Sequence, residues 1–195
     1  MDDITSIHQA RKTILEMIHD RGYEVPISYN YDKISDFKQI FNKKQYDIHI
    51  LGDKQIYVKF ILVTKVRPNI LREYINQIRE QHISDTNDLI IVIKHKPNST
   101  LKKISKEFKG VQIFWIRNLI INITKHKLNP IFEEINGDQI NELLLKLQLK
   151  TRYQLPIMLK EDPISLYYGF KPGSVCKIIR KSVTSGECTS YRCIK

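Results

Sequence analysis

The chain has 195 residues, of which 42% are hydrophobic and 27% are charged, and this is the composition of a folded globular protein. Its apolar runs are shorter than the roughly 20 residues that a membrane-spanning helix needs, and its first residues do not have the pattern of a secretory signal. The formal net charge of +11 makes nucleic acid a candidate partner, but the charge is spread along the chain and forms no basic block.

The first 117 residues carry helix and strand patterns in turn. An opening helix over residues 5–22 is predicted to end at Gly22, because apolar residues recur at helical spacing before it. A second helix over residues 32–42 has the same spacing. The elements predicted after it are two strands around Gly52 and Asp53 (46–51 and 54–63), a helix after Pro68, a strand at 89–94, a helix at 99–108 and a strand at 111–117. This alternation predicts an α/β domain over residues 1–117 with a mixed, mostly parallel sheet.

Residues 118–195 have a different pattern of elements. Residues 119–130 are predicted to be extended, and Asp138 is predicted to cap a helix that carries Ile140, Leu143, Leu144 and Leu147. The elements predicted after it are a two-turn helix from Asp162 and Pro163 to Gly169, a tight turn at Pro172 and Gly173, and strands near 174–180 and 189–194 joined around Ser185 and Gly186. The sequence therefore predicts a small C-terminal α+β domain over 118–195 with a closing β-hairpin.

No enzymatic site emerges from the residue spacings. Asp47 and Lys59 have the placement used by metal-dependent nucleases, but Tyr57 stands where the second metal-binding carboxylate is required. His95 and His126 are each flanked by two lysines, which disfavours cation binding and predicts exposed side chains. The sequence predicts no catalytic residue, no metal site and no cofactor.

The three cysteines all lie in the last 20 residues and form no Cys-x-x-Cys pair. This arrangement predicts reduced thiols in an intracellular protein. No acid-base partner is evident beside Cys176, Cys188 or Cys193, so we expect them to be small packing residues on strands.

Two stretches of the sequence carry a family resemblance. Residues 10–25 match an opening helix, and a longer set of matches lies in the C-terminal part: His126, Leu128, Pro130, Gln154, Leu155, Pro156, Asp162, Pro163, Tyr168, Gly169, Gly173, Val175, Lys177, Ile178, Arg180, Ser182, Tyr191 and Arg192. In these residues the chain resembles the fifth subunit of eukaryotic-type DNA-directed RNA polymerases, whose C-terminal domain is similar to a small subunit of archaeal RNA polymerases. Between about residues 26 and 117 the resemblance extends only to the pattern of elements.

The resemblance implies a non-catalytic subunit of a multisubunit DNA-dependent RNA polymerase. In the family, the C-terminal domain anchors on the largest polymerase subunit, and the N-terminal domain forms a jaw beside downstream duplex DNA. The expected partners are therefore other polymerase subunits and, by weak non-specific contact, DNA, with no membrane and no homo-oligomer. The lysines and arginines that approach DNA are not identified by the sequence.

The matched C-terminal residues, except Val175, Lys177 and Ile178, are the predicted partner interface. Gly169, Pro172 and Gly173 are expected to stabilise the local fold. For Arg180, Tyr191 and Arg192, a role in the local fold and direct contact with a partner fit about equally well. Val183, Lys181 and Asn129 depart from the family pattern, which leaves contacts at those positions open.

Two other functions and two locations also fit the sequence. A free-standing basic DNA-binding protein and a degenerate nuclease-like domain are the alternative functions. The location is the nucleus if the chain is cellular, and a cytoplasmic viral factory or virion if it comes from a large DNA virus.

Overall fold

A computed structural model describes residues 3–29, 34–43, 45–52, 54–63, 66–81, 87–182 and 186–195. The chain divides into two compact units, Met1–Ile121 and Asn122–Lys195. The sequence places the domain boundary slightly earlier, between residues 117 and 118. Asp32, Asp53, Val183 and Ser185, on which parts of the sequence analysis rely, lie outside the described residues. Within the described ranges, no helix combines the length and the apolar character needed to cross a membrane.

The N-terminal unit is built on a four-stranded sheet in the order β1-β2-β3-β4. Strand β1 is antiparallel to β2, while β2, β3 and β4 are parallel, so the prediction of a mixed, mostly parallel sheet is confirmed. The elements are α1 (Asp3–Asp20), a 3-10 turn (Ile27–Tyr29), α2 (Ile34–Asn42), β1 (Ile48–Ile50), β2 (Ile56–Ile61), α3 (Pro68–Gln81), β3 (Asp88–Ile93), α4 (Ser99–Glu107), β4 (Val111–Trp115) and α5 (Ile116–Leu119).

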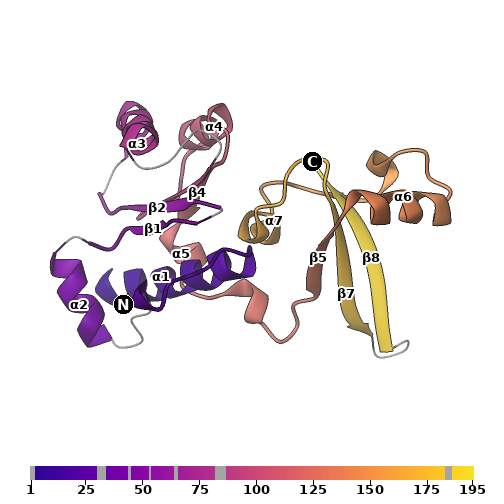
Figure 1. Ribbon diagram of the computed structural model, residues 1–195, viewed down its shortest axis with the longest axis horizontal. Coiled ribbons are helices and arrows are strands. Elements are labelled where there is room, and N and C mark those ends of the chain that lie inside the picture. Colours follow the sequence, from indigo (N-terminus) through magenta and orange to yellow (C-terminus); the bar gives the residue numbers. More distant parts are fainter. Residues whose placement is uncertain are drawn as a thin grey trace. The chain divides into compact units, whose positions relative to one another are not determined.

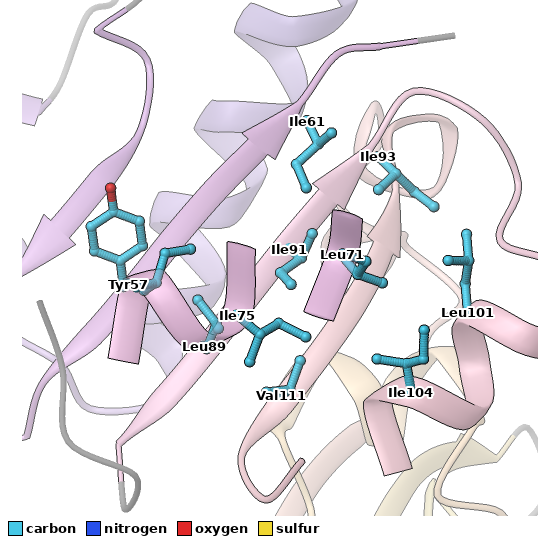
Figure 2. Packing of buried hydrophobic residues seen from close by; sticks show 11 residues of the cluster. Tyr57, Ile61, Leu71, Ile75, Leu89, Ile91, Ile93, Leu101, Ile104 and Val111 are labelled. Carbon is cyan, nitrogen blue, oxygen red and sulfur yellow. The ribbon is translucent and has the colours of Figure 1, made fainter. Parts of the chain in front are cut away.

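Both faces of this sheet are covered by helices. Figure 1 shows α3 and α4 on one side of the sheet and α1 on the other. On the α3 and α4 side, Ile75 packs in one cluster with Leu89 and Ile91 (Figure 2). Residues Leu89–Ile93 of β3 are all buried, as expected for a strand with apolar cover on both faces. The helical stripes are less regular than predicted, since Ile34 and Ile70 are each 39% exposed.

Two glycines of this unit adopt the left-handed backbone conformation next to a helix or a strand. Gly22 has a φ of +82° just after α1, as the sequence predicts, and Gly110 has a φ of +76° just before β4. A Cβ at position 110 would lie 2.9 Å from the carbonyl oxygen of Asn87, which is closer than such contacts allow. Gly110 is therefore required both by its backbone conformation and by the neighbouring chain.

Gly110→Ala is expected to lower the free energy of unfolding of the N-terminal unit by about 1–3 kcal/mol. Gly22→Ala is the matched control, because nothing lies within 4 Å of a Cβ built there. The control carries only the conformational cost of about 1 kcal/mol. Urea denaturation followed by the fluorescence of Trp115, the single tryptophan of the chain, measures both variants. Equal losses would show that the contact with Asn87 costs nothing.

The C-terminal unit is a second four-stranded sheet in the order β5-β7-β8-β6. Strands β5, β7 and β8 are antiparallel neighbours, and β6 runs parallel to β8. The elements are a 3-10 turn (Ile123–Lys125), β5 (Ile131–Ile135), α6 (Gly137–Lys146), a second 3-10 turn (Arg152–Gln154), β6 (Ile157–Met158), α7 (Pro163–Tyr168), β7 (Val175–Ser182) and β8 (Gly186–Ile194). The predicted α+β class and the closing hairpin are confirmed.

Two sequence-based predictions in this region are wrong, and two strands were not predicted. Residues 119–130 are not extended: Leu119 is buried at the end of α5, and Asn122 caps a 3-10 turn by accepting from the Thr124 N–H at 2.9 Å. Helix α6 is capped by Asn136 and not by Asp138. The Asn136 side chain accepts from the Gln139 N–H at 3.0 Å, and Gln139 Oε1 accepts from the Asn136 N–H at 3.1 Å. Strands β5 and β6 are absent from the prediction.

Each face of the second sheet has its own core. Helix α6 packs on one face, where Ile140 and Leu143 meet Val175 and Cys193. Residues near α7 pack on the other face, where Tyr168 and Phe170 meet Cys176, Ile178 and Ile194. The neighbouring residues Val175 and Cys176 of β7 therefore enter different cores, as side-chain alternation along a strand requires.

Candidate functional site

Several of the predicted interface residues build turns. The Asp162 side chain accepts from the Ile164 N–H at 2.9 Å and caps α7, with Pro163 at the first helical position. Gly169 ends α7 with a φ of +70°. Gly173 has a φ of +86°, and the Ser174 N–H donates to the Lys171 carbonyl at 3.1 Å across the turn. These side chains shape the loops between the strands.

Other residues of the predicted interface contribute to the fold by packing or by hydrogen bonding. Leu155 is buried in the α6 core. Tyr168 stacks on Phe170, with ring centroids 5.4 Å apart and planes 14° from parallel. Gln154 Oε1 accepts from the backbone N–H groups of Lys150 at 2.7 Å and Thr151 at 3.1 Å, which holds the segment before β6. The structure thus ties these three residues to the fold.

The remaining predicted residues reach the surface to different degrees. His126, Leu128, Pro156 and Arg180 are exposed, and Pro130, Ser182, Tyr191 and Arg192 are half-buried. Arg192 Nη1 donates to the Ile157 carbonyl at 3.3 Å, so this side chain braces β6 against β8. Because side chains alternate along a strand, Tyr191 lies on the opposite face from Arg192. Arg180 shares the face of Arg192 but pairs with Cys188, nearer the end of the hairpin.

An apolar surface around β6 is a feature that the sequence analysis did not single out. Tyr153, Ile157 and Leu159 are 67%, 48% and 64% exposed, respectively. Between them, Leu155 and Met158 are buried, so the segment has one side in the core and one side in solvent. The apolar run over residues 155–159 was visible in the sequence, but a continuous run does not tell which side chains face outward. We call Tyr153, Ile157 and Leu159 the β6 surface.

A basic cavity of about 850 Å³ lies in the N-terminal unit, where β3 and β4 end. Its polar lining is mostly positive, and its apolar wall includes residues of α1, α2 and α5. The lining residues that the structure describes are Asp3, Ser6, Ile7, Phe41, Leu62, Lys94, His95, Lys96, Trp115, Ile116, Arg117 and Ile120. Sequence analysis singled out only His95 of this set. The cavity brings together segments that are far apart in the chain, so no local pattern announces it.

Among the described residues that line the basic cavity, the positive side chains outnumber the negative ones. Lys94 Nζ lies 2.6 Å from Oδ2 of Asp3, the only acidic residue among the described residues of the lining. The Trp115 indole N–H donates to the Lys94 carbonyl at 3.1 Å, and the Arg117 guanidinium lies 5.7 Å from the Trp115 ring centroid. Lys96 and Arg117 are exposed at the rim, where they can meet an anionic group such as phosphate.

Asp47 and Lys59, the two residues with nuclease-like placement, form an ion pair with each other. Lys59 Nζ lies 2.6 Å from Asp47 Oδ2, while Asp47 Oδ1 accepts from the Phe60 N–H at 2.9 Å. Burial lowers the pKa of Lys59, but its hydrogen bond and charge attraction to Asp47 outweigh this effect and raise the pKa overall. Both carboxylate oxygens of Asp47 are thus bound by residues of β2. No group of three or more metal-binding side chains occurs within the described ranges.

The cysteines differ in their surroundings. Cys176 and Cys193 are buried, whereas Cys188 is exposed, which corrects the expectation that all three pack inside. Burial raises the pKa of the Cys176 thiol to about 11, and burial also raises the pKa of Cys193. Among the described residues all three are free thiols.

Comparison with known families identifies the family to which the chain belongs. Residues 1–113 match the N-terminal domain of RNA polymerase Rpb5, and residues 121–194 match its C-terminal domain. The chain belongs to the RNA polymerase Rpb5 family. The two matches correspond to the two compact units, so the family resemblance seen at the C-terminus extends through the N-terminal sheet.

Curated relatives of this Rpb5-family chain match along its whole length. Subunit 5A of DNA-directed RNA polymerase V from Arabidopsis thaliana is 29% identical over 95% of this chain and 86% of that protein. The RPABC1 subunit of RNA polymerases I, II and III from Caenorhabditis briggsae is 31% identical over 94% of this chain and 93% of its own length. The corresponding Dictyostelium discoideum subunit is 28% identical over 98% of each chain.

The two arginines of the Rpb5-family hairpin are expected to contribute differently to stability. Arg192→Ala should weaken the β6–β8 pairing by about 0.5–1.5 kcal/mol, because it removes the hydrogen bond to Ile157. Arg180→Ala on the same face should change stability by less than about 0.5 kcal/mol. Hydrogen exchange at the Cys193 amide, which donates to the Pro156 carbonyl at 2.9 Å, reports the local opening. Unchanged exchange in Arg192→Ala would mean that the arginine does not brace β6.

Proposed function

We propose that this Rpb5-family chain is a non-catalytic subunit of a multisubunit DNA-dependent RNA polymerase, in which residues 122–195 anchor on the largest subunit and residues 1–121 lie beside downstream DNA. The observation that carries the proposal is the match of both units to the two Rpb5 domains. The division near residue 121 is proposed as the domain boundary. A polymerase subunit acts inside the cell. We propose the nucleus if the chain comes from a cellular host, and a viral factory or virion if it comes from a virus.

The β6 surface supports the anchoring role. Ile157 lies on the short strand β6, Tyr153 lies in the 3-10 turn before it and Leu159 follows it. The strand is held by Arg192 and by the Cys193 amide. Apolar and aromatic side chains on a rigid support are favourable contact points, because little conformational freedom is lost when a partner binds. The capped α7 and the turn at Gly173 add to this rigidity.

Leu159→Asp should reduce recovery of the polymerase by tenfold or more when the tagged full-length chain is purified from cells, because it places a charge in the proposed contact. Leu145→Asp, at a 79% exposed position on α6, is the matched control and should recover the polymerase as well as the unaltered chain does. Equal recovery with Leu159→Asp would remove the β6 surface from the anchor. Recovery of no polymerase subunit with the unaltered chain would remove the proposed function.

The rim of the basic cavity supports the proposed proximity to DNA. Lys96 and Arg117 are exposed positive side chains on one unit, and among the described cavity residues only Asp3 opposes them. Contacts of lysine and arginine with phosphates position a protein on DNA without reading its sequence. We therefore propose weak contact that is independent of base sequence.

Lys96→Glu should weaken binding of the full-length chain to a duplex of about 30 base pairs by threefold or more, equally for unrelated sequences. Lys160→Glu, an exposed lysine of the C-terminal unit with the same change in net charge, is the control and should have a smaller effect. Fluorescence anisotropy over a range of salt concentrations measures both, and affinity should fall as salt rises. Tight binding that favours one sequence would instead support a free-standing DNA-binding protein.

A further inference from the structure

Strand β8 has an open edge along most of its length. Strand β7 pairs with β8 from Gly186 to Cys193, but β6 pairs on the other side only with Cys193 and Ile194. The Cys193 N–H points to the β6 side, where it donates to Pro156, and the Ile194 N–H points to the β7 side, where it donates to Ser174. The direction of backbone groups thus alternates along the strand.

This alternation identifies the open groups. With no interruption of the register between Ser182↔Gly186 and Val175↔Cys193, the N–H and C=O groups of Glu187, Thr189 and Tyr191 point away from β7. No strand among the described residues of the C-terminal unit pairs with them. The edge therefore offers a row of backbone donors and acceptors to another chain.

The two edges of the sheet are protected to different extents. Strand β5 at one edge follows Pro130 and carries the adjacent charges of Glu133 and Glu134. The open part of β8, Glu187–Tyr191, contains no proline and no lysine, and only one charged residue. Natural proteins blunt exposed edges with such residues to prevent pairing with other chains. The edge of β8 lacks this protection.

We propose that an extended, acidic segment of another polymerase subunit adds to the sheet as a strand beside β8, pairing with Glu187, Thr189 and Tyr191. The proposal rests on the proposed function, because it gives the mode by which the subunit is held. An added strand uses main-chain hydrogen bonds for affinity and alternate side chains for specificity. On the neighbouring strand β7, Arg180 and Lys181 lie opposite Cys188 and Glu187, and Arg192 follows the open part of β8. These basic side chains outnumber Glu187, which favours a segment with acidic side chains.

A proline at position 189 separates this proposal from its alternatives. Thr189→Pro removes an outward N–H and places a ring at the edge, but it leaves the hydrogen bonds toward β7, which belong to residues 188 and 190. Thr189→Val keeps the N–H and is the matched control. Association of the full-length chain with polymerase purified without this subunit should weaken by tenfold or more in Thr189→Pro and by less than twofold in Thr189→Val.

Hydrogen exchange gives a second measurement that needs no variant. In the free chain the amides of Glu187, Thr189 and Tyr191 should exchange fast, and the amides of Cys188 and Ser190 should exchange slowly. In the assembled polymerase, the outward amides should slow by tenfold or more. The same measurement on Thr189→Pro should find the amides of Cys188 and Ser190 still slow, which shows that the hairpin is intact.

Each other outcome overturns the proposal. Normal assembly of Thr189→Pro, or outward amides that stay fast in the polymerase, would show that no strand is added at β8 while leaving the proposed function in place. Slow outward amides in the free chain, with the mass of a dimer by sedimentation, would identify a second copy as the occupant. If the unaltered chain does not associate with polymerase, the proposed function fails and this proposal fails with it.

Discussion

The register between β7 and β8 is the constraint on which the C-terminal unit depends. Val175 pairs with Cys193 and the pairing continues without interruption to Ser182 and Gly186. Since side chains alternate, this register sends Val175 and Cys193 into the α6 core and Cys176 and Ile178 into the other core. A shift by one residue would exchange the two sets and place Lys177 in a core, so the two cores specify the register together.

The residues of the strongest sequence pattern mostly serve this arrangement. Asp162, Gly169 and Gly173 shape the turns that bring α7 and β7 to the sheet, and Gln154 holds the chain before β6. Near these residues, the exposed apolar side chains of the β6 surface do not belong to the family pattern that the sequence carries. A family pattern can thus be dominated by residues that shape turns and hold strands, rather than by exposed side chains.

The success of sequence-based prediction follows the strength of local signals. The opening helix, the buried strands β2 and β3 and the Asp162-capped helix α7 were predictable, because periodicity or capping chemistry is unambiguous there. Strand β5 was missed because Glu133 and Glu134 break its alternation, and β6 because it has two residues. Residues 119–122 have the composition of a strand, but tertiary packing buries Leu119 at a helix end.

The candidate site was less predictable than the fold. The resemblance named the family from residues such as Tyr191 and Arg192, but the face that each side chain occupies depends on the strand register. The basic cavity requires α1, β3 and β4 to meet, and the separation between Asp3 and Lys94 in sequence hides their ion pair. Such sites depend on long-range packing, which local patterns do not encode.

The unequal environments of the three thiols mean that one of them, Cys188, can be modified selectively. Near neutral pH, Cys176 and Cys193 are screened by burial and by their raised pKa values, so an alkylating dye modifies Cys188 first. The natural sequence therefore carries a built-in attachment site for a fluorophore or spin label on the hairpin. The same asymmetry means that, under oxidising conditions, covalent joining of two folded chains would proceed through Cys188.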